Sequence, residues 1–315
     1  MLRDFRELMA AARGRGPIRV AVAAAQDAEV LEAVRDGIRA GLIQAVLVGD
    51  SALIGPMVAA LGLAEQVEVI HEPDLAKASL VAAGCVRDGG AQALMKGMVN
   101  SSVFLKAALD PGRGLRTGRL LSHLAAMEIP GVSKLSFFTD GGMNIAPGLE
   151  EKKQILANAL EALHLMGVET PRVAVLAANE QVSPRMPATV DAQALVAAWE
   201  AGAFPGCIVE GPIAMDVALS PEAAQHKGIH SRVSGEVDLF LVPNIEAGNM
   251  ITKVLLHYTP SRFAGMVLGA SHPIVMGSRA DSAEAKLNAI ALAALMAGAT
   301  EGSRSHIHQM AGAGP

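Results

Sequence analysis

Polar side chains able to bind an anion follow a short apolar run near the C-terminal end of the chain. Ser278, Arg279 and Asp281 come directly after residues 273–277, where a buried strand would end and a helix would begin. Free N–H groups and the helix dipole make a helix start receptive to an anion, and the guanidinium fork suits phosphate oxygens. The alternative is that Ser278 or Asp281 only caps the helix while Arg279 is solvated, because such caps are routine.

A second polar turn follows the apolar run at residues 93–96. Lys96 stands beside Gly97, and the polar pair Asn100-Ser101 marks the start of the next helix. At a strand end, the lysine ammonium can bind phosphate as a point charge. It can equally be a lysine that extends into solvent at a domain edge.

A third polar turn lies within residues 241–250. Asn244, Glu246, Gly248 and Asn249 follow an apolar run and a proline, and Gly248 would let the backbone approach another group closely. On the residues alone, a helix capped by Asn244 is the better interpretation of this turn. Substrate binding by these four residues is the functional alternative.

Apolar runs with strand character alternate with longer Ala- and Leu-rich stretches of helical spacing. The expected strands are residues 18–25, 45–49, 67–71, 93–96, 135–139, 172–178, 207–210, 237–242, 263–268 and 273–276. The expected helices include residues 27–41, 75–87, 150–166, 192–201, 246–257 and 281–296. This alternation predicts an α/β fold with a mostly parallel sheet. The three polar turns then lie at the carboxyl ends of strands, where such sheets bind ligands.

The chain of 315 residues is long enough for two domains. Its longest turn-rich break, residues 140–149, is the best candidate boundary. We expect a first α/β domain of residues 1–140 plus 277–315, and an inserted second α/β domain of residues 141–276. A cleft between two such domains would be a common place for a ligand.

Composition excludes several classes of function. A hydrophobic fraction of 51% with 18% charged residues is typical of a compact globular protein. The net charge of −5 and the aromatic share of 3% argue against nucleic-acid binding. No apolar window is long enough to span a membrane, and no apolar stretch follows the charged start of the chain, so we expect a cytoplasmic protein.

Common cofactor and metal motifs are missing from the sequence. It contains no GxxxxGK[ST] loop, no GxGxxG after the first strand and no GxSxG elbow. Cys85 and Cys207 lack metal-ligand spacing, and the pair His226 and His230 is interrupted by Gly228. We therefore expect no metal site.

Taken together, these segments resemble the phosphate acetyl/butyryltransferase family. The run Pro243-Asn244-Ile245-Glu246-Ala247-Gly248-Asn249 is similar to that family's Pro-Asn-x-x-Ala-Gly-Asn motif. Residues 273–287, with Ser278-Arg279-Ala280-Asp281-Ser282, resemble the butyryltransferase branch more than the acetyltransferase branch. Residues 96–116 and the turn at 139–144 also fit, so the likeness covers nearly the whole chain.

The resemblance implies a reversible reaction, acyl-CoA plus phosphate giving acyl phosphate plus free coenzyme A. It also implies a fold like that of isocitrate and isopropylmalate dehydrogenases, and a homodimer or higher homo-oligomer. No metal or redox cofactor is implied, because coenzyme A is a substrate or product. By the same likeness, Arg279 binds phosphate or the coenzyme, and Ser278 stabilises the leaving thiolate.

Two positions depart from the acetyltransferase pattern. Ala285 stands where those enzymes carry an aspartate proposed as the base for the coenzyme A thiol. Asp281 and Glu284 are one helical turn apart in the expected helix and either can substitute, with Asp281 preferred. A phosphate-binding arginine of the acetyltransferases falls near Lys106, which keeps the charge but loses the fork.

Two other functions stay open on the sequence. One is a metal-dependent NAD(P) dehydrogenase of the same fold, which would need clustered Asp or His ligands. The other is a non-catalytic subunit that only binds acyl-CoA, which the alanine at position 285 keeps possible. The acyl chain length is not readable from the residues, because one methylene changes binding by only about 1–3 kcal/mol; the branch likeness favours butyryl over acetyl.

Overall fold

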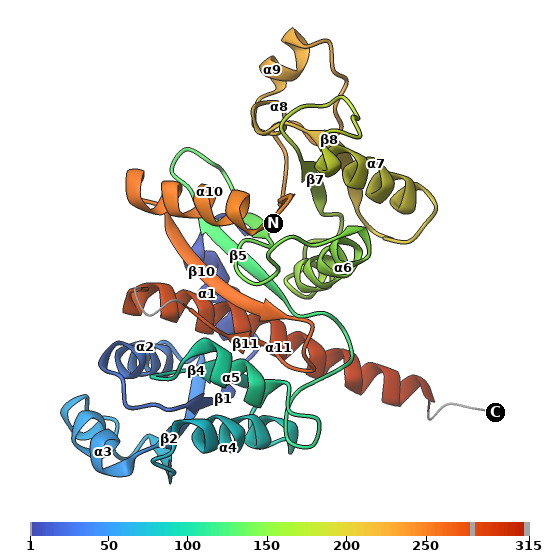
Figure 1. Cartoon of the computed structure of the whole chain (residues 1–315). Coiled ribbons are helices and arrows are strands. Elements are labelled where there is room, and N and C mark those ends of the chain that lie inside the picture. Colours follow the sequence, from blue (N-terminus) through green and yellow to red (C-terminus); the bar gives the residue numbers. More distant parts are fainter. Residues whose placement is uncertain (1, 278–280, 312–315) are drawn as a thin grey trace. The chain divides into compact units, whose positions relative to one another are not determined.

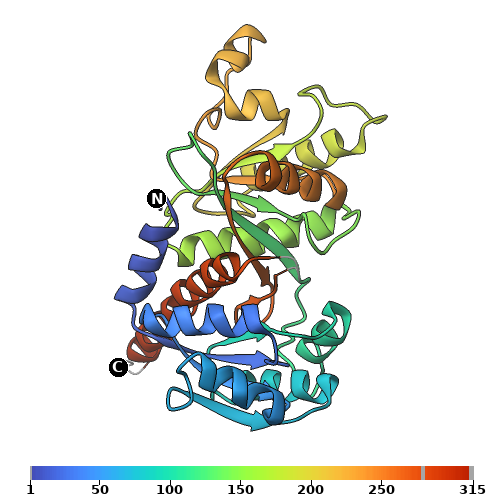
Figure 2. The same ribbon diagram turned by 90° about the vertical axis from the view of Figure 1, so that its left-hand side faces the viewer.

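The chain divides into two compact units. The computed structural model shown in Figures 1 and 2 describes residues 2–277 and 281–311, with side chains as far as Gly298. One unit, called here the inserted unit, comprises Leu120–Phe263 with Met1–Arg3. The other, the terminal unit, comprises Asp4–Arg119 and Ala264–Pro315. Both divisions fall earlier in the chain than the boundaries at 140 and 276 that we expected from the turns.

The terminal unit is built from βα repeats. Its elements are α1 (Phe5–Gly14), β1 (Ile18–Ala23), α2 (Ala28–Arg39), β2 (Ile43–Gly49), α3 (Ser51–Ala60), β3 (Val67–His71), α4 (Leu75–Arg87), β4 (Ala93–Lys96), α5 (Ser101–Ala108), β10 (Arg262–Leu268), β11 (Ile274–Val275) and α11 (Ala283–Ala311). The chain passes from the inserted unit into this one within β10. Apart from the antiparallel pair β10 and β11, the strands of this unit are parallel.

The strand order of the terminal unit is β3-β2-β1-β4-β11-β10. From β1 the chain moves to β2 and β3 on one side, and α4 then returns it to β4 on the other side of β1. The connections that leave β1 and β4 therefore run in opposite directions along the sheet, and the carboxyl ends of these two strands form a switch point, where such sheets bind ligands. Helix α4 packs on β1 and β2, while α11 packs along α1 and α2 (Figures 1 and 2).

Aspartates start three of the helices that follow strands in this unit. The carboxylate of Asp27 accepts a hydrogen bond from the Val30 N–H at 2.9 Å at the start of α2. Asp50 and Asp74 cap α3 and α4 in the same way. Such caps satisfy donors that a helix leaves unpaired in its first turn, so each helix begins at a defined residue after its strand.

The inserted unit has its own mostly parallel strand set. Its elements are β5 (Ser122–Glu128), β6 (Ser136–Thr139), α6 (Leu149–Leu165), β7 (Arg172–Leu176), α7 (Pro187–Glu200), β8 (Ile208–Ile213), α8 (Met215–Leu219), α9 (Pro221–His226), β9 (Leu239–Leu241) and α10 (Ile245–Tyr258). The strand order is β5-β6-β9-β7-β8, with only β5 and β6 antiparallel. Stacking of Phe138 on Phe240, with centroids 4.7 Å apart, joins β6 to β9 in its core.

Strand β5 is the main element that the sequence did not predict. Its residues Ser122–Glu128 include a serine, a histidine and a glutamate, so the run lacks a clear apolar pattern. It forms because it pairs with β6, and β6 in turn pairs with β9. These pairings also place residues 122–139 in the inserted unit. No helix among the described residues is both long and apolar enough to cross a membrane.

Candidate active site

Three neighbouring parallel strands of the terminal unit end side by side. Ala23 of β1 pairs in register with Lys96 of β4, and Met95 pairs with Val275 of β11. Each is followed by a polar turn, as the sequence predicted for the ends of β4 and β11. The last side chains of these strands and the first residues of the following helices therefore share one edge of the sheet.

Close backbone packing explains the glycine after Lys96. The N–H groups of Gly97 and Met98 donate to the carbonyls of Ala23 and Ala24, each at 2.8 Å. A Cβ on Gly97 would lie 2.3 Å from the carbonyl oxygen of Ala24. Only glycine fits at this position, and the two turns after β1 and β4 are thereby held together at the strand ends.

A small cavity lies over these strand ends, and we call it the switch-point pocket. Its lining includes Asp27, Lys96, Gly97, Met98, Gly277, Asp281, Ala285 and Lys286. The enclosed space is about 20 Å³, enough for one water-sized group. A larger ligand would be held at the mouth of the pocket or would displace a side chain. Met98 is the side chain that can move most easily, because it is flexible and 46% exposed.

Lys96 is buried at the floor of this pocket and is only 8% exposed. Its ammonium donates to the carbonyl oxygen of Val99 at 3.1 Å and to that of Gly97 at 3.4 Å. The interpretation of Lys96 as a solvated lysine at a domain edge is therefore wrong. A buried ammonium group at the carboxyl edge of a parallel sheet is a candidate partner for an anion.

Asp281 is half-buried in the same pocket. A Cβ on Gly277 would lie 2.7 Å from Oδ2 of Asp281, so the carboxylate lies directly over the end of β11. Glu284 is exposed and does not line the pocket. Of the two carboxylates that the sequence left open as a base, the structure places only Asp281 in the cavity.

The relation between these two carboxylates differs from the expectation. Helix α11 begins at Ala283, and Ser282 caps it by accepting the Ala285 N–H at 3.2 Å. Asp281 therefore precedes the helix and does not share a helical face with Glu284. The serine at 282 takes the cap in place of Asp281, which leaves the aspartate carboxylate outside the helix. Ser278 and Arg279 lie outside the described residues.

The other predicted residues of the terminal unit that the structure describes lie on α5 or directly before it. Asn100 occupies the cap position of this helix without a side-chain cap hydrogen bond, and it is exposed, as is Ser101. Lys106 is exposed in the last turn of α5. None of these three residues is among those that line the switch-point pocket.

In the inserted unit, two motifs singled out in the sequence meet each other. Asn244 caps α10 by accepting the Ala247 N–H at 3.0 Å, which confirms the cap interpretation. Gly248 is buried against the turn after β6, and a Cβ added to it would lie 2.7 Å from Cα of Gly141. Asn249 Nδ2 is 3.4 Å from the Gly141 carbonyl oxygen, and Glu246 is exposed in the first turn.

The turn after β6 is organised by Asp140, which is 1% exposed. Its carboxylate accepts the N–H groups of Gly142 and Met143, each at 2.8 Å, and that of His123 at 3.0 Å. Asn144 Nδ2 adds a hydrogen bond at 2.6 Å. Asp140 therefore holds the turn on which Gly248 packs, and these hydrogen bonds satisfy the buried carboxylate.

Sequence reasoning missed two residues of the switch-point pocket. Asp27 lies there as the cap of α2, and Lys286 enters from the first turns of α11 with an exposed fraction of 9%. Lys286 donates to Glu29 Oε2 at 2.8 Å and to the carbonyl oxygen of Asp281. The available signal was a lysine at the start of a helix, shortly before residues 289–297, which are all Ala, Ile, Leu or Met.

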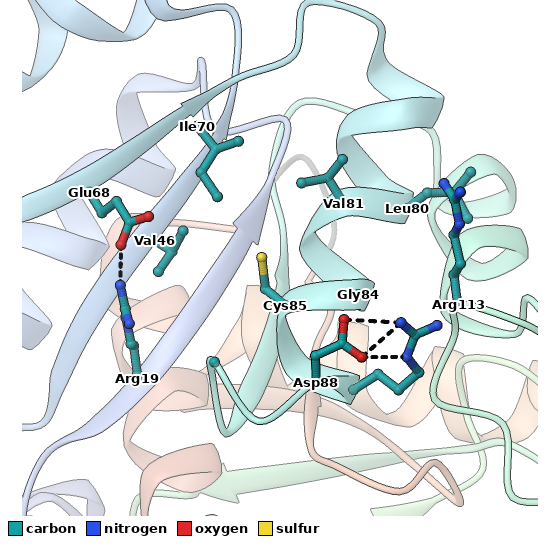
Figure 3. A pocket seen from close by; sticks show the side chains of 12 residues that line it. Arg19, Val46, Glu68, Ile70, Leu80, Val81, Gly84, Cys85, Asp88 and Arg113 are labelled. Atoms are coloured by element: carbon teal, nitrogen blue, oxygen red, sulfur yellow. Dashed lines mark hydrogen bonds and ion pairs between the residues drawn. The ribbon is translucent and has the colours of Figure 1, made fainter.

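A larger cavity of about 480 Å³ lies near the amino ends of β1 and β3 (Figure 3). Four of its charged lining residues form two ion pairs, Arg19 with Glu68 and Arg87 with Asp88 at 2.7 Å, and Arg113 also lines it. Desolvation raises the pKa of the Cys85 thiol in its wall. None of the predicted site residues lines this cavity, and its edge of the sheet is the one opposite to where parallel sheets bind ligands.

The terminal unit is a doubly wound α/β unit with two buried ammonium groups, those of Lys96 and Lys286, at its switch point. The family model described as "Phosphate acetyl/butaryl transferase" matches residues 62–294. A phosphate butyryltransferase of Clostridium acetobutylicum is 44% identical over 299 residues, covering 95% of this chain and 99% of that protein. The chain therefore belongs to the phosphate acetyl/butyryltransferase family.

Solved structures support the same fold. The chain is similar to a branched-chain phosphotransacylase from Enterococcus faecalis, with a TM-score of 0.79 and 29% identity over 89% of this chain and 99% of that one. A 4-hydroxythreonine-4-phosphate dehydrogenase from Klebsiella pneumoniae has a TM-score of 0.56 and 14% identity, covering 89% and 99%. The second likeness concerns the fold alone, and it confirms the expected dehydrogenase-like architecture.

Proposed function

We propose that the protein transfers a short-chain acyl group reversibly between coenzyme A and inorganic phosphate, with butyryl preferred over acetyl. The observation that carries this proposal is that a buried Lys96 and the Asp281 carboxylate both line the switch-point pocket of a chain of this family. The preference for butyryl is supported by the likeness of residues 273–287 to the butyryltransferase branch. It is also supported by the 44% identity to a butyryltransferase.

The residue types fit the chemistry of this reaction. A phosphate oxygen attacks the thioester carbonyl carbon, the C–S bond breaks, and the thiolate leaves as coenzyme A. Lys96 would hold the phosphate by its charge and orient it, and positioning of this kind can supply several kcal/mol of the barrier. In the reverse direction, the Asp281 carboxylate would accept the proton of the coenzyme A thiol as it attacks the acyl phosphate. No redox cofactor or metal takes part in these steps.

From the family resemblance, we also propose that Ser278 stabilises the departing thiolate and that Arg279 binds phosphate or the coenzyme. Arg279→Ala should then lower kcat/KM by about a hundredfold or more. Near-normal phosphate-dependent turnover of acyl-CoA by this variant would remove Arg279 from the site. Asn244, Glu246, Gly248 and Asn249 stay candidates for contacts to the substrate only through the same resemblance.

The decisive assay measures release of coenzyme A from butyryl-CoA and from acetyl-CoA, with and without phosphate, by a thiol reagent. We expect release to require phosphate and to be faster with butyryl-CoA. Burial raises the pKa of the Cys207 thiol to about 11, and desolvation also raises that of Cys85. Both protein thiols should therefore react slowly with the reagent, because the thiolate is the reactive form. Release without phosphate, or none at all, would contradict the proposal.

The two alternative functions predict different results. A non-catalytic acyl-CoA-binding subunit would bind the thioester and release no coenzyme A. A metal-dependent dehydrogenase would change nicotinamide absorbance with a hydroxy acid and a divalent metal. The described residues contain no group of three or more His, Cys, Asp and Glu side chains placed to hold a metal ion. The likeness to a dehydrogenase at 14% identity concerns the fold alone.

We further propose that the protein is a cytoplasmic homodimer or higher homo-oligomer. An apolar groove of the inserted unit, about 570 Å³ in volume, is bordered by the outer face of α10, where Met250 is 64% and Val254 54% exposed. An exposed apolar face of this size supports association with a second copy. Analytical ultracentrifugation of the wild type and of Val254→Lys tests the association. We expect the wild type to sediment as an oligomer and the variant to dissociate more readily, and a wild type that is monomeric at all concentrations would contradict the proposal.

A further inference from the structure

Lys286 is a second buried lysine beside the strand ends that carry Lys96. It lies on α11, lines the switch-point pocket together with Lys96, and is 9% exposed. Two of its ammonium N–H groups donate, to Glu29 Oε2 at 2.8 Å and to the carbonyl oxygen of Asp281. An ammonium has three donors, and the third has no protein partner among the described residues. The pocket is the space that such a partner would occupy.

A purely structural role explains this lysine poorly. Its partner Glu29 has a side chain that is 55% exposed, so the ion pair is half-solvated. Pairs of this kind contribute little to stability, while burying the ammonium is costly. Residues 289–297 of the same helix are all buried, and all are Ala, Ile, Leu or Met. An apolar side chain at position 286 would continue that face at lower cost.

Lys152 provides a matched comparison within the same chain. It too is the fourth residue of its helix, α6, it is 5% exposed, and it pairs with Asp191 Oδ2 at 2.6 Å. Unlike Lys286, it lines none of the described cavities. Burial and an ion pair therefore occur at both lysines, and the pocket is what distinguishes Lys286.

We propose that Lys286 is a second phosphate-binding cation, which acts with Lys96 on the oxygens of inorganic phosphate; this inference rests on the proposed function. Two ammonium groups on one cavity match the negative charge of phosphate better than one. Glu29 keeps Lys286 neutralised while the pocket is empty, and its exposure lets it turn to solvent when phosphate arrives. Because the cavity is small, the phosphate sits at its mouth, where Met98 can move aside.

The test separates the KM for phosphate from the KM for acyl-CoA. Lys286→Met keeps the apolar stem of the side chain and removes the charge, so the KM for phosphate should rise about tenfold or more. The KM for butyryl-CoA should stay within about threefold, and Lys286→Arg should restore part of the phosphate affinity. Glu29→Gln should leave the KM for phosphate within about threefold, because the pair itself is not the function.

Lys152→Met is the control for loss of a buried, ion-paired lysine. It should lower the thermal midpoint while leaving the KM for phosphate within about threefold. If Lys286→Met behaves like this control, with an unchanged KM for phosphate, the proposal is wrong. If Lys286→Met does not fold, Lys286→Gln and Lys286→Arg are compared with the wild type by the same measurements.

A second readout does not depend on turnover. Inorganic phosphate alone should raise the thermal midpoint of the wild type, and the rise should be much smaller in Lys286→Met. Equal rises in both proteins would overturn the role of Lys286. A wild type that phosphate stabilises but that releases no coenzyme A would instead contradict the proposed function and leave the phosphate site standing.

Discussion

The polar motifs at the carboxyl ends of the strands have different roles in the terminal unit and in the inserted unit. At the edge of β1, β4 and β11, the charged side chains of Lys96, Asp281 and Lys286 line a cavity. At the edge of β6 and β9, Gly248 packs on the turn that follows Asp140, and Asn244 caps its helix. Both turns look alike in sequence, as a strand followed by polar residues and glycine. The difference teaches that a motif can mark a close packing contact as well as a ligand site. Charge is buried at both edges, but Asp140 is satisfied by hydrogen bonds within its own turn, whereas Lys96, Asp281 and Lys286 line a cavity.

The largest effect is expected at the charged edge. Lys96→Ala should lower kcat/KM for butyryl-CoA and phosphate by about a hundredfold or more, because it removes the buried cation at the floor of the pocket. Steady-state kinetics with both substrates varied would measure this. If the variant folds normally and keeps kcat/KM within about threefold of the wild type, Lys96 is not part of the active site, and the two edges do not differ in the way described above.

The second largest effect is expected at Asp281, which lies at the same sheet edge. Asp281→Asn should lower kcat/KM in the direction of acyl-CoA formation by about tenfold to a hundredfold, since a proton acceptor is lost. The matched control is Glu284→Gln, which should change it by less than about threefold because Glu284 is exposed. Rates of acyl-CoA formation from acyl phosphate would measure both. If Glu284→Gln lowers kcat/KM strongly and Asp281→Asn does not, Glu284 is the base.

At the glycine edge, stability should change first. Gly248→Ala places a methyl group 2.7 Å from Cα of Gly141 and 2.8 Å from Cγ2 of Val242, so it should cost about 1–3 kcal/mol of unfolding free energy. Gly55→Ala on α3 is the control: a Cβ there meets nothing within 4 Å, and it should be neutral or stabilising by up to about 1 kcal/mol. Denaturant unfolding measures both, and equal stabilities would show that the contact is easily relieved.

The smallest effect is expected for Lys106, which lies outside the pocket lining in the last turn of α5. Lys106→Ala should change the KM for phosphate by less than about threefold, because an exposed lysine is screened by solvent. Titration of phosphate at saturating butyryl-CoA would show this. A rise of about tenfold or more would return Lys106 to the site as the family resemblance suggested.

Much of this molecule follows from local sequence, and the remainder depends on pairing between distant segments. Alternating apolar runs and helical spacing predicted the α/β fold, because βα repeats are local patterns. Strand β5 was missed because its polar residues interrupt the apolar pattern, and the strand forms only by pairing with β6 in the folded protein. The start of α11 at Ala283 depends on Ser282 in place of Asp281, a choice between two good caps that spacing does not settle.

The site shows the same limit. Lys96 and Asp281 were identifiable because each follows a strand and stands next to a glycine turn or a helix start. Lys286 was not, because its burial results from the packing of α11 against α2, which begins more than two hundred residues earlier. The partner of Gly248 was also hidden, since a glycine indicates that something approaches closely without indicating what.

The division of the terminal unit into two stretches of chain has a consequence for synthesis on the ribosome. Residues 4–119 emerge with β4 as a sheet edge that lacks its partner, and β11 is made only after the entire inserted unit. An unpaired apolar edge of this kind can associate with other chains while it waits. Nascent chains that stop before residue 264 should therefore be prone to aggregate, and phosphate should not protect them, because half of the pocket lining has yet to be translated.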